Sequence, residues 1–588
     1  MCIVSIEGFV DFLVTGHFPS AITCAMADVT ISTLATSYQP SNSSSSRARS
    51  RQRRRQDLIR YASFFSAIFS CLCAGTISCF SLYGHLFLER LKYTQTQVNI
   101  VALAGQISIS LPFSLIGYLC DRTGPAFVSF LSAIFFGLGY TLAAFTYKIG
   151  ASTVHRHTDS QVQSVWVMVI AFIFIGIATT FMYLSSLTTC AKNFQKAKYR
   201  GFALSSPIAA YGLSGLWQSQ IGSRLFYERS PEGGKGDVDV FKFFIFLACI
   251  LLVAGLTGSI LLKIVDEDDL IEEAVERLER SGLLENNESP RDGLDNYSAN
   301  SNAINYEGIE VRRELSLKRG ATFTKGNILN KEAAAFFKDP TMWWFAAGFF
   351  LVSGPGDAFI TNLGTVIGTL YPSYIDPSSS PTTAATHVSI VSITSTTARI
   401  LFGTLTDIFT PTPGLKSGVQ KFSASSSIHP RFSLSKFYIS RMTFLLISAL
   451  LLSAGQVFLA VGFVQNHAER FWIVSGLIGF GYGAIFTLSP LIVSIVWGVE
   501  NFGTNWGLIA MTTAVSATAW DLIYSKVYET GAKAPSNFTD GEEDLICHGK
   551  ACYMTTFWAM SWTVWIGCAL WLWAWKGTRG WTSRGVSL

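Results

Sequence analysis

The sequence predicts an all-α membrane protein whose twelve transmembrane helices form two pseudo-symmetric six-helix bundles. Of its 588 residues, 49% are hydrophobic and 14% are charged, and the mean hydropathy is +0.35. A water-soluble chain of this length needs a charged surface that so few ionisable residues do not supply. The 45 phenylalanines and 15 tryptophans are typical of surfaces that face lipid and its polar boundary.

Stretches long and apolar enough to cross a membrane support this fold. A spanning helix needs roughly 20 mostly apolar residues, and such stretches fall into two sets of six. A polar segment of about 77 residues separates the two sets. The predicted helices lie at 61–87, 98–120, 126–147, 164–188, 201–225, 241–263, 341–371, 385–408, 438–463, 471–497, 503–526 and 554–576.

This spacing predicts five regions. The first tail is expected to be mostly disordered, and Met26 is an alternative start to Met1. The central loop is expected to hold an acidic helix and then a disordered stretch, because its second part has few apolar residues. The regions are the N-terminal tail 1–60, the first bundle 61–263, the central loop 264–340, the second bundle 341–576 and the C-terminal tail 577–588.

The distribution of basic residues predicts which side each loop faces. With both chain ends in the cytoplasm, 31 of the 44 lysines and arginines lie on the inner side and 12 on the outer side. Cytoplasmic loops carry such an excess of Lys and Arg. We therefore expect both termini in the cytoplasm. The basic run Arg47–Arg55 indicates a topology signal or an anionic-lipid contact, and we expect no nucleic-acid partner.

The two halves share a short motif at corresponding places. The second predicted helix ends in GYLCDRTGP, from Gly117, and the eighth ends in GTLTDIF, from Gly403. Both contain Gly-x-Leu-x-Asp. Similar Gly- and Ser-rich stretches recur between the fourth and tenth helices and between the fifth and eleventh. Three matches at corresponding places favour duplicated halves, the organisation of many secondary transporters.

The aspartates of this motif are candidate gate residues. Glycine lets two helices approach closely, and a carboxylate at the membrane boundary can bind a neighbouring helix N-terminus or pair with Arg122. Such a contact could close one side of the protein and break when that side opens. The alternative is an ordinary helix-end cap in a tight turn. The predicted gating residues are Gly117, Asp121, Arg122, Gly124, Gly403 and Asp407.

The run from Gly117 to Gly124 resembles the loop signature of the major facilitator superfamily, and the resemblance covers about residues 61–576. Pro125 and Ala126 stand where that signature usually has a basic pair. Through NFQKAKYRGFALSSPIAAYGLSG, GPGDAFITNLGTVIGTLYP and ARILFG the chain is similar to the fungal monocarboxylate-transporter-homologue group, near the nodulin-like proteins. The resemblance implies the twelve-helix major facilitator fold and transport of a small solute by alternating access.

Arg399 lies in the middle of the eighth predicted helix. It precedes Asp407 by eight residues, which is about 12 Å along a helix. An arginine at that depth costs at least about 2.5–3.5 kcal/mol, so we expect it to face a cavity and to have a partner. The carriers that this group resembles have an aspartate one turn earlier, where this chain has Ser395. The other clearly mid-span charge is Asp357, after Ser-Gly-Pro-Gly in the seventh helix.

We expect Arg399 to bind substrate and Asp357 to bind a proton. A planar guanidinium can make two parallel bonds to a carboxylate. In the empty site Asp357 would pair with Arg399, and an arriving anion would compete for the guanidinium and leave the carboxylate to take up a proton. This scheme is a symport. One alternative is a structural ion pair between the seventh and eighth helices, with an uncharged or cationic substrate.

A second alternative is a solute-sensing receptor that signals through the central loop. An enzyme is not expected. The sequence has no phosphate-binding glycine loop, no nucleophile–base motif and no cluster of His and Cys with metal-ligand spacing. We therefore expect no ATP-driven transport, cofactor or metal.

Other polar residues inside the predicted helices are candidates for the cavity wall, although each alone is more typical of helix packing. We select Tyr83, Tyr183 and Asn362 as further substrate contacts. Asp521 is expected at the outer boundary of the membrane. The remaining candidates are Gln106, Tyr211, Gln218 and Tyr482.

The last outer loop contains CHGKAC and NFT. Cys547 and Cys552 predict a loop disulfide if the loop faces an oxidising compartment, and otherwise they are two unrelated thiols. Asn537 begins an Asn-x-Thr sequence, which predicts glycosylation.

The central loop carries a candidate sorting signal. Glu279 followed by Leu283 and Leu284 resembles the acidic dileucine signal that adaptors read on the way to endosomes or vacuoles. An ordinary leucine pair on an amphipathic helix is the alternative. With the family resemblance, this signal favours the vacuolar membrane over the plasma membrane. We expect a monomer whose partners are membrane lipid, a small-molecule substrate, protons and a sorting adaptor.

Overall fold

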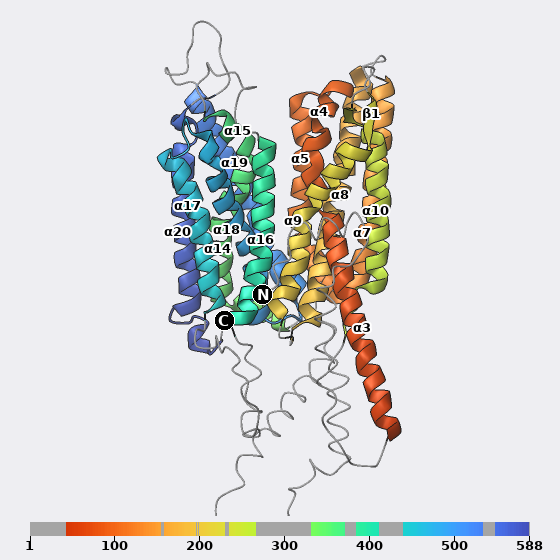
Figure 1. Cartoon of the computed structure of the whole chain (residues 1–588), viewed down its shortest axis with the longest axis vertical. Coiled ribbons are helices and arrows are strands. Elements are labelled where there is room, and N and C mark those ends of the chain that lie inside the picture. The colour runs from red at the N-terminus through yellow and green to blue at the C-terminus, as the bar shows by residue number, and fades with distance from the viewer. Residues whose placement is uncertain are drawn as a thin grey trace, which may run out of the picture. The chain divides into compact units, whose positions relative to one another are not determined.

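The chain is helical almost throughout the part that the structure describes, and the helices of the two halves form two groups (Figure 1). The structure is a computed structural model. Its contacts separate a short unit, Met1–Leu58, from a main unit, Ile59–Leu588, which contains all the spans except the first residues of α3. The described residues are 43–153, 158–195, 197, 199–229, 235–265, 331–370, 384–410, 439–532, 547 and 549–586.

The first half forms the six predicted spans, of which the first two are broken into shorter helices. The first span consists of α3, η1 and α4, and the second consists of α5 and α6. The described elements are α3 (Ser43–Ala74), η1 (Thr76–Cys79), α4 (Phe80–Arg90), α5 (Gln95–Ser110), α6 (Phe113–Thr123), α7 (Pro125–Thr153), α8 (Thr158–Asn193), α9 (Arg200–Leu225) and α10 (Val240–Leu261).

The second half forms the other six spans, and its first span is also broken. Short 3-10 turns η3, η5 and η6 lie at Ala468–Arg470, Lys550–Cys552 and Thr582–Arg584. The described helices are α13 (Lys331–Lys338), α14 (Pro340–Thr361), α15 (Leu363–Gly368), α16 (Ala384–Phe409), α17 (Arg441–Val461), α18 (Phe471–Val496), α19 (Phe502–Ala532) and α20 (Met554–Lys576).

The spans differ in how well they suit lipid. Within the described residues, eight spans are long and apolar enough to cross a membrane, and α5 with α6, bent by 42°, makes a ninth. Helices α9, α14 and α19 complete the twelve, and each contains several glycine, serine or threonine residues. They pack closely on other helices: α9 along α16, α19 along α6, and α14 between α19 and α20. These contacts cover the polar faces that lipid would not accommodate.

The first span was expected to be one continuous helix, and it is broken at Gly75. A Cβ at this position would overlap the Ser214 side chain of α9, so glycine allows the two helices to touch. The chain then makes a 3-10 turn, in which the Ser78 hydroxyl donates to the Gly75 carbonyl at 2.6 Å. Close packing against α9 therefore accounts for the break.

The second and seventh spans were also expected to be continuous. Pro112 lies between α5 and α6, and a proline has no N–H for the helical ladder. In the seventh span α14 ends at Thr361, and the Asn362 side chain donates to the Ala358 carbonyl at 2.9 Å. Residues that interrupt or compete with the backbone ladder thus break both helices.

A small β-hairpin, which was not predicted, connects α9 to α10. Strand β1 (Tyr227–Arg229) pairs antiparallel with β2 (Lys235–Val238), and Tyr227 lies opposite Val238. The hairpin lies in a connection between spans, so the all-α class of the bundles is unaffected.

The connection between α19 and α20 contains a disulfide between Cys547 and Cys552. The Gly549 N–H donates to the Thr369 carbonyl at 3.0 Å, which ties this loop to the end of α15. The predicted sorting and glycosylation residues Glu279, Leu283, Leu284 and Asn537 lie outside the described residues.

The segment after α20 packs against the beginning of α14, although it was expected to be a tail. Trp581 is fully buried, and its indole N–H donates to Thr341 Oγ1 at 2.9 Å. Arg584 forms an ion pair with Asp339 at 2.8 Å. Burial raises the pKa of Asp339, but hydrogen bonds from Arg584, Thr341 and Trp497 outweigh it and hold the pKa below its usual range.

Replacing Asp339 with Asn should lower stability at neutral pH and have little effect in acid. Because the folded pKa lies below the unfolded one, the ionised carboxylate contributes stability that is fully present above the unfolded value, about pH 4. That stability is lost as the pH falls through the folded pKa. The measurement is thermal unfolding of the purified wild-type and D339N proteins from pH 3 to 7.

Glu500→Gln is the control, because Glu500 is an exposed acidic residue outside the tail and outside the Asp339 cluster. A difference between wild type and D339N that stays constant with pH would contradict the assignment.

Candidate substrate site and gate

Arg399 lies between the two halves of the protein. It belongs to α16, its side chain is only 8% exposed, and its Nη1 donates to the Ile208 carbonyl of α9 at 2.8 Å. A Cβ on Gly212 would overlap this guanidinium. The missing side chain of Gly212 therefore makes room for the arginine against α9.

Three tyrosines surround the guanidinium. Tyr183 of α8, Tyr211 of α9 and Tyr482 of α18 lie close enough to interact with it electrostatically. The rings of Tyr183 and Tyr211 also contact each other edge to face, with centroids 5.1 Å apart. Four helices from both halves thus contribute to one polar cluster around Arg399.

The expected ion pair between Arg399 and Asp357 is not formed. Within the described residues no salt bridge joins them, and Asp357 Oδ1 accepts a hydrogen bond from the Tyr482 hydroxyl at 3.1 Å. Gly356 allows this, because the Tyr482 ring lies where a Cβ of residue 356 would be. The arginine is held by α9 instead, and Tyr482 interacts with both charged residues.

The buried donors beside Arg399 are not all satisfied. Arg399 Nε and the Thr396 hydroxyl have no hydrogen-bond partner among the described residues. Thr396 lies one turn before Arg399, and it faces Gly212 of α9. A ligand with acceptor atoms would find several unpaired donors at this place.

Two of the other predicted substrate contacts lie elsewhere. Tyr83 is fully buried in an aromatic cluster of the first half, edge to face with Phe244 at 4.8 Å and close to Phe80 at 5.4 Å. It packs there as a core residue, and its role as a substrate contact stays a prediction. Asn362 donates to Asp521 Oδ1 at 2.7 Å at the break after α14. These two residues form a separate polar pair.

The aspartates of the repeated motif bind helix N-termini in the opposite half. Asp121 Oδ2 accepts from the Thr504 backbone N–H at 2.7 Å and from its hydroxyl at 2.9 Å, at the start of α19. Asp407 Oδ1 and Oδ2 accept from the N–H groups of Gly201 and Phe202 at 2.7 and 2.8 Å, at the start of α9. We call these two contacts the latch.

Glycines bring the helices of the latch together. A Cβ on Gly117 would overlap the Gly503 carbonyl, and one on Gly201 would overlap the Gly403 carbonyl. Each of the two latch contacts therefore needs a glycine on both helices. The backbone N–H groups come within reach of a short aspartate side chain because nothing separates the two backbones.

Two basic residues outside the repeated motif make further contacts beside the latch. Lys192 forms an ion pair with Asp121 Oδ1 at 3.0 Å. Arg200 Nη2 donates to the Ser494 carbonyl and hydroxyl at 2.8 and 2.9 Å, which ties the start of α9 to α18. Lys192 lies in the last turn of α8 and Arg200 begins α9, so both lie at the basic connection before the fifth span, which could have indicated this role.

The other two predicted gating residues make contacts within α6. Arg122 lies over the Tyr118 ring at 5.3 Å. Gly124 ends α6 with φ of 88°, a conformation that glycine adopts more readily than other residues, and its N–H donates to the Cys120 carbonyl at 3.0 Å.

Known proteins resemble this chain over most of its length. The model of the Major Facilitator Superfamily matches residues 64–520. "Probable transporter mch1" of Neurospora crassa is 50% identical over 547 residues, which cover 90% of each chain. "Probable transporter MCH1" of Gibberella zeae is 46% identical over 95% of this chain and 96% of the relative. Both relatives are thus named as transporters and not as enzymes.

Solved structures show the same fold. The proton:xylose symporter XylE bound to 6-bromo-6-deoxy-D-glucose matches with a TM-score of 0.55 and 14% identity, over 89% of this chain and 96% of that one. A bacterial homologue of the iron transporter ferroportin, in an outward-facing state, matches with a TM-score of 0.53 and 8% identity, over 87% and 98%. At such low identity these likenesses bear on the fold alone.

Replacing Asp407 with Asn should loosen the latch. The amides of Gly201 and Phe202 lose a charged acceptor, a loss of about 1.5 kcal/mol, so their hydrogen exchange should rise about tenfold. The measurement is hydrogen–deuterium exchange of the peptide that covers 199–206. Asp121→Asn should have the corresponding effect at the start of α19.

The matched control is Glu500→Gln, which removes an acidic charge just before α19 without touching either latch. Equal hydrogen exchange in D407N, E500Q and the wild type would show that the Asp407 carboxylate does not hold the start of α9.

Proposed function

The chain belongs to the major facilitator superfamily, within its fungal monocarboxylate-transporter-homologue group, and we propose that it carries a small organic anion together with a proton. Its role as a transporter follows from the family. The nature of the substrate rests on one observation: Arg399 is buried between the two halves and has no carboxylate partner among the described residues.

An anion suits this site because a buried cation needs a counter-charge. Burying an arginine in a spanning helix costs at least about 2.5–3.5 kcal/mol, and one backbone carbonyl offsets only part of that. Arg399 Nε and the Thr396 hydroxyl lack partners, and tyrosines stand around them. A carboxylate could accept from the guanidinium and from Thr396 at once, which favours a monocarboxylate over an uncharged solute.

Asp357 is the proposed proton site. It is half-buried, it accepts a hydrogen bond from Tyr482, and Tyr482 also lies beside Arg399. The tyrosine thus links the proposed proton site to the proposed anion site. A proton on Asp357 would compensate the charge of an anion on Arg399, which is the chemical basis of a symport.

The latch is proposed as the cytoplasmic gate. Basic residues predict that the latch end faces the cytoplasm, with both termini on the same side. In the conformation seen here the latch is closed, and release of solute to the cytoplasm would require Asp121 and Asp407 to leave the N-termini of α19 and α9. Alternating access would then exchange a closed latch for an open one.

We propose the vacuolar membrane as the location. The support is the Glu279, Leu283 and Leu284 sequence, and an adaptor is the proposed partner of that signal. The disulfide and Asn537 would then lie on the luminal side, where oxidation and glycosylation occur. A monomer with a lipid environment and a small-molecule substrate is the proposed working form.

Replacing Arg399 with Gln should reduce anion uptake by about 10- to 100-fold, because the charged hydrogen bonds to the anion are lost. Asp357→Asn should leave exchange of anion across the membrane but remove its dependence on a proton gradient. The measurement is uptake of labelled small monocarboxylates into vesicles that hold the purified protein, with and without an imposed proton gradient.

Arg224→Gln is the control, since Arg224 is an exposed basic residue at the C-terminal end of α9. Full uptake by R399Q would place the anion elsewhere. If no acid is transported but deletion of 285–330 abolishes a cellular response to a solute, the receptor hypothesis replaces the carrier hypothesis.

Replacing Leu283 and Leu284 with Ala should move the protein from the vacuolar to the plasma membrane, because an adaptor reads the pair. The measurement is fluorescence microscopy of the tagged full-length chain. Leu270→Ala with Ile271→Ala, in the same acidic segment, is the control. An unchanged location in the L283A/L284A variant would contradict the sorting role.

A further inference from the structure

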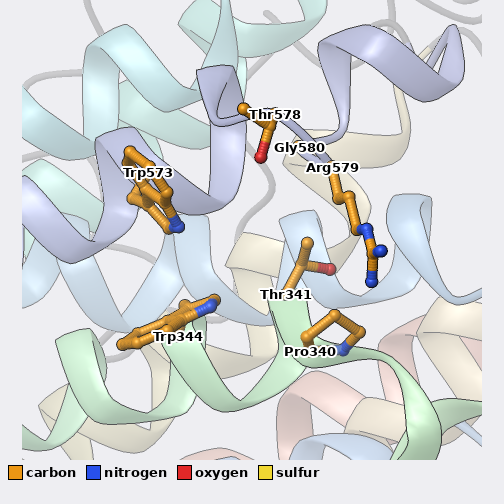
Figure 2. Close-up of a pocket in the computed structure, with 7 residues that line it drawn as sticks. All are labelled: Pro340, Thr341, Trp344, Trp573, Thr578, Arg579 and Gly580. Atoms are coloured by element: carbon orange, nitrogen blue, oxygen red, sulfur yellow. The ribbon is translucent and has the colours of Figure 1, made fainter.

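A pocket of about 140 Å³ lies where the beginning of α14 meets the end of α20 (Figure 2). Asp357 follows Pro340 by 17 residues in α14, which is about 25 Å along the helix. The pocket is therefore distinct from the proposed substrate site. It is lined by Pro340, Thr341, Trp344, Trp573, Thr578, Arg579 and Gly580.

The pocket lies at the boundary between lipid and water. Helix α14 begins at Pro340 and α20 ends at Lys576, so the pocket is formed by the ends of two spanning helices. Trp344 and Trp573 are 43% and 55% exposed. Tryptophan gathers at this depth because its ring is apolar and its N–H needs a polar partner.

Hydrogen-bond donors without acceptors surround the pocket. The indole N–H groups of Trp344 and Trp573 have no acceptor among the described residues, and Figure 2 shows both indole nitrogens on the side toward the pocket. The Arg579 guanidinium points toward the Pro340 and Thr341 side of the same space. Several donors thus face one opening.

No described carboxylate neutralises Arg579. The acidic group nearest in sequence to the pocket wall is Asp339, and it is held by Arg584 through two hydrogen bonds of 2.8 and 2.9 Å and by the Trp497 indole at 3.0 Å. Arg579 forms no ion pair with a described residue. The pocket therefore presents a net positive charge.

We propose that this pocket binds the phosphate of an anionic phospholipid headgroup. Arg579 would donate to the phosphate oxygens through its fork of N–H groups, and the two indole N–H groups would donate to the phosphate or ester oxygens. The exposed faces of Trp344 and Trp573 would lie against the acyl chains. A free phosphate ion would make no use of the two tryptophans, which is why a lipid is favoured.

A bound lipid would connect the beginning of α14 to the end of α20. The segment after α20 already packs on α14 through Trp581 and Arg584, and the headgroup would add a contact on the lipid side of the same junction. This proposal does not depend on the identity of the transported solute.

The test measures lipid binding by the full-length protein. Purified protein in detergent is titrated with dioleoyl phosphatidylserine or dioleoyl phosphatidylcholine, and native mass spectrometry gives the bound fraction. Arg579→Gln should weaken phosphatidylserine binding about five- to tenfold. Trp573→Phe, which keeps an apolar ring but removes the N–H, should weaken it about two- to threefold.

Lys576→Gln is the matched control. It removes a charge from the same helix end, but Lys576 lies over the Trp575 ring at 4.7 Å and does not line the pocket. Its effect should stay below about twofold. The proposal is overturned if R579Q binds phosphatidylserine normally, or if R579Q and K576Q weaken it equally, since that would indicate diffuse attraction to the surface.

A third arm separates the lipid from a free ion. Inorganic phosphate at a tenfold excess should not displace phosphatidylserine from the wild type. Displacement of the lipid by phosphate alone would show that the pocket holds a soluble oxyanion, and the lipid proposal would then fail.

Discussion

A charged or hydrogen-bonding group inside a membrane must find its partner within the protein, because lipid offers none. This constraint accounts for the contacts that hold the two halves together. Arg399 donates to a carbonyl of α9, Asp407 accepts from the first amides of α9, and Asp121 accepts from the start of α19. Three charged groups in spanning helices thus reach across to the other half.

Glycine makes these contacts geometrically feasible. An aspartate side chain is short, so it reaches a helix N-terminus in the other half only where the two backbones almost touch. Gly117 with Gly503 and Gly403 with Gly201 provide that approach in the two halves. In each half, the duplicated motif therefore places a glycine, which allows close helix contact, one turn before an aspartate. The positive end of the neighbouring helix stabilises the charge of that aspartate.

Helix α16 carries both the candidate site and one side of the latch. Arg399 and Asp407 both bind α9, about 12 Å apart along the same helix. A ligand that binds the guanidinium competes with the Ile208 carbonyl, so it acts on the same α16–α9 contact that Asp407 maintains. The proposed substrate site and the proposed gate thus share one pair of helices, which would connect them directly.

The twelve spans and the motif at their ends could be predicted from the amino-acid sequence. Apolar length and Gly-x-Leu-x-Asp are local patterns, and the predicted latch aspartates do bind helix N-termini. The partner of Arg399, the aromatic burial of Tyr83 and the breaks in the first, second and seventh spans could not be predicted in this way. These depend on how each helix is rotated and on which distant helix it touches. The sequence does not reveal that the Ile208 carbonyl is the partner of Arg399, because every residue has a backbone carbonyl.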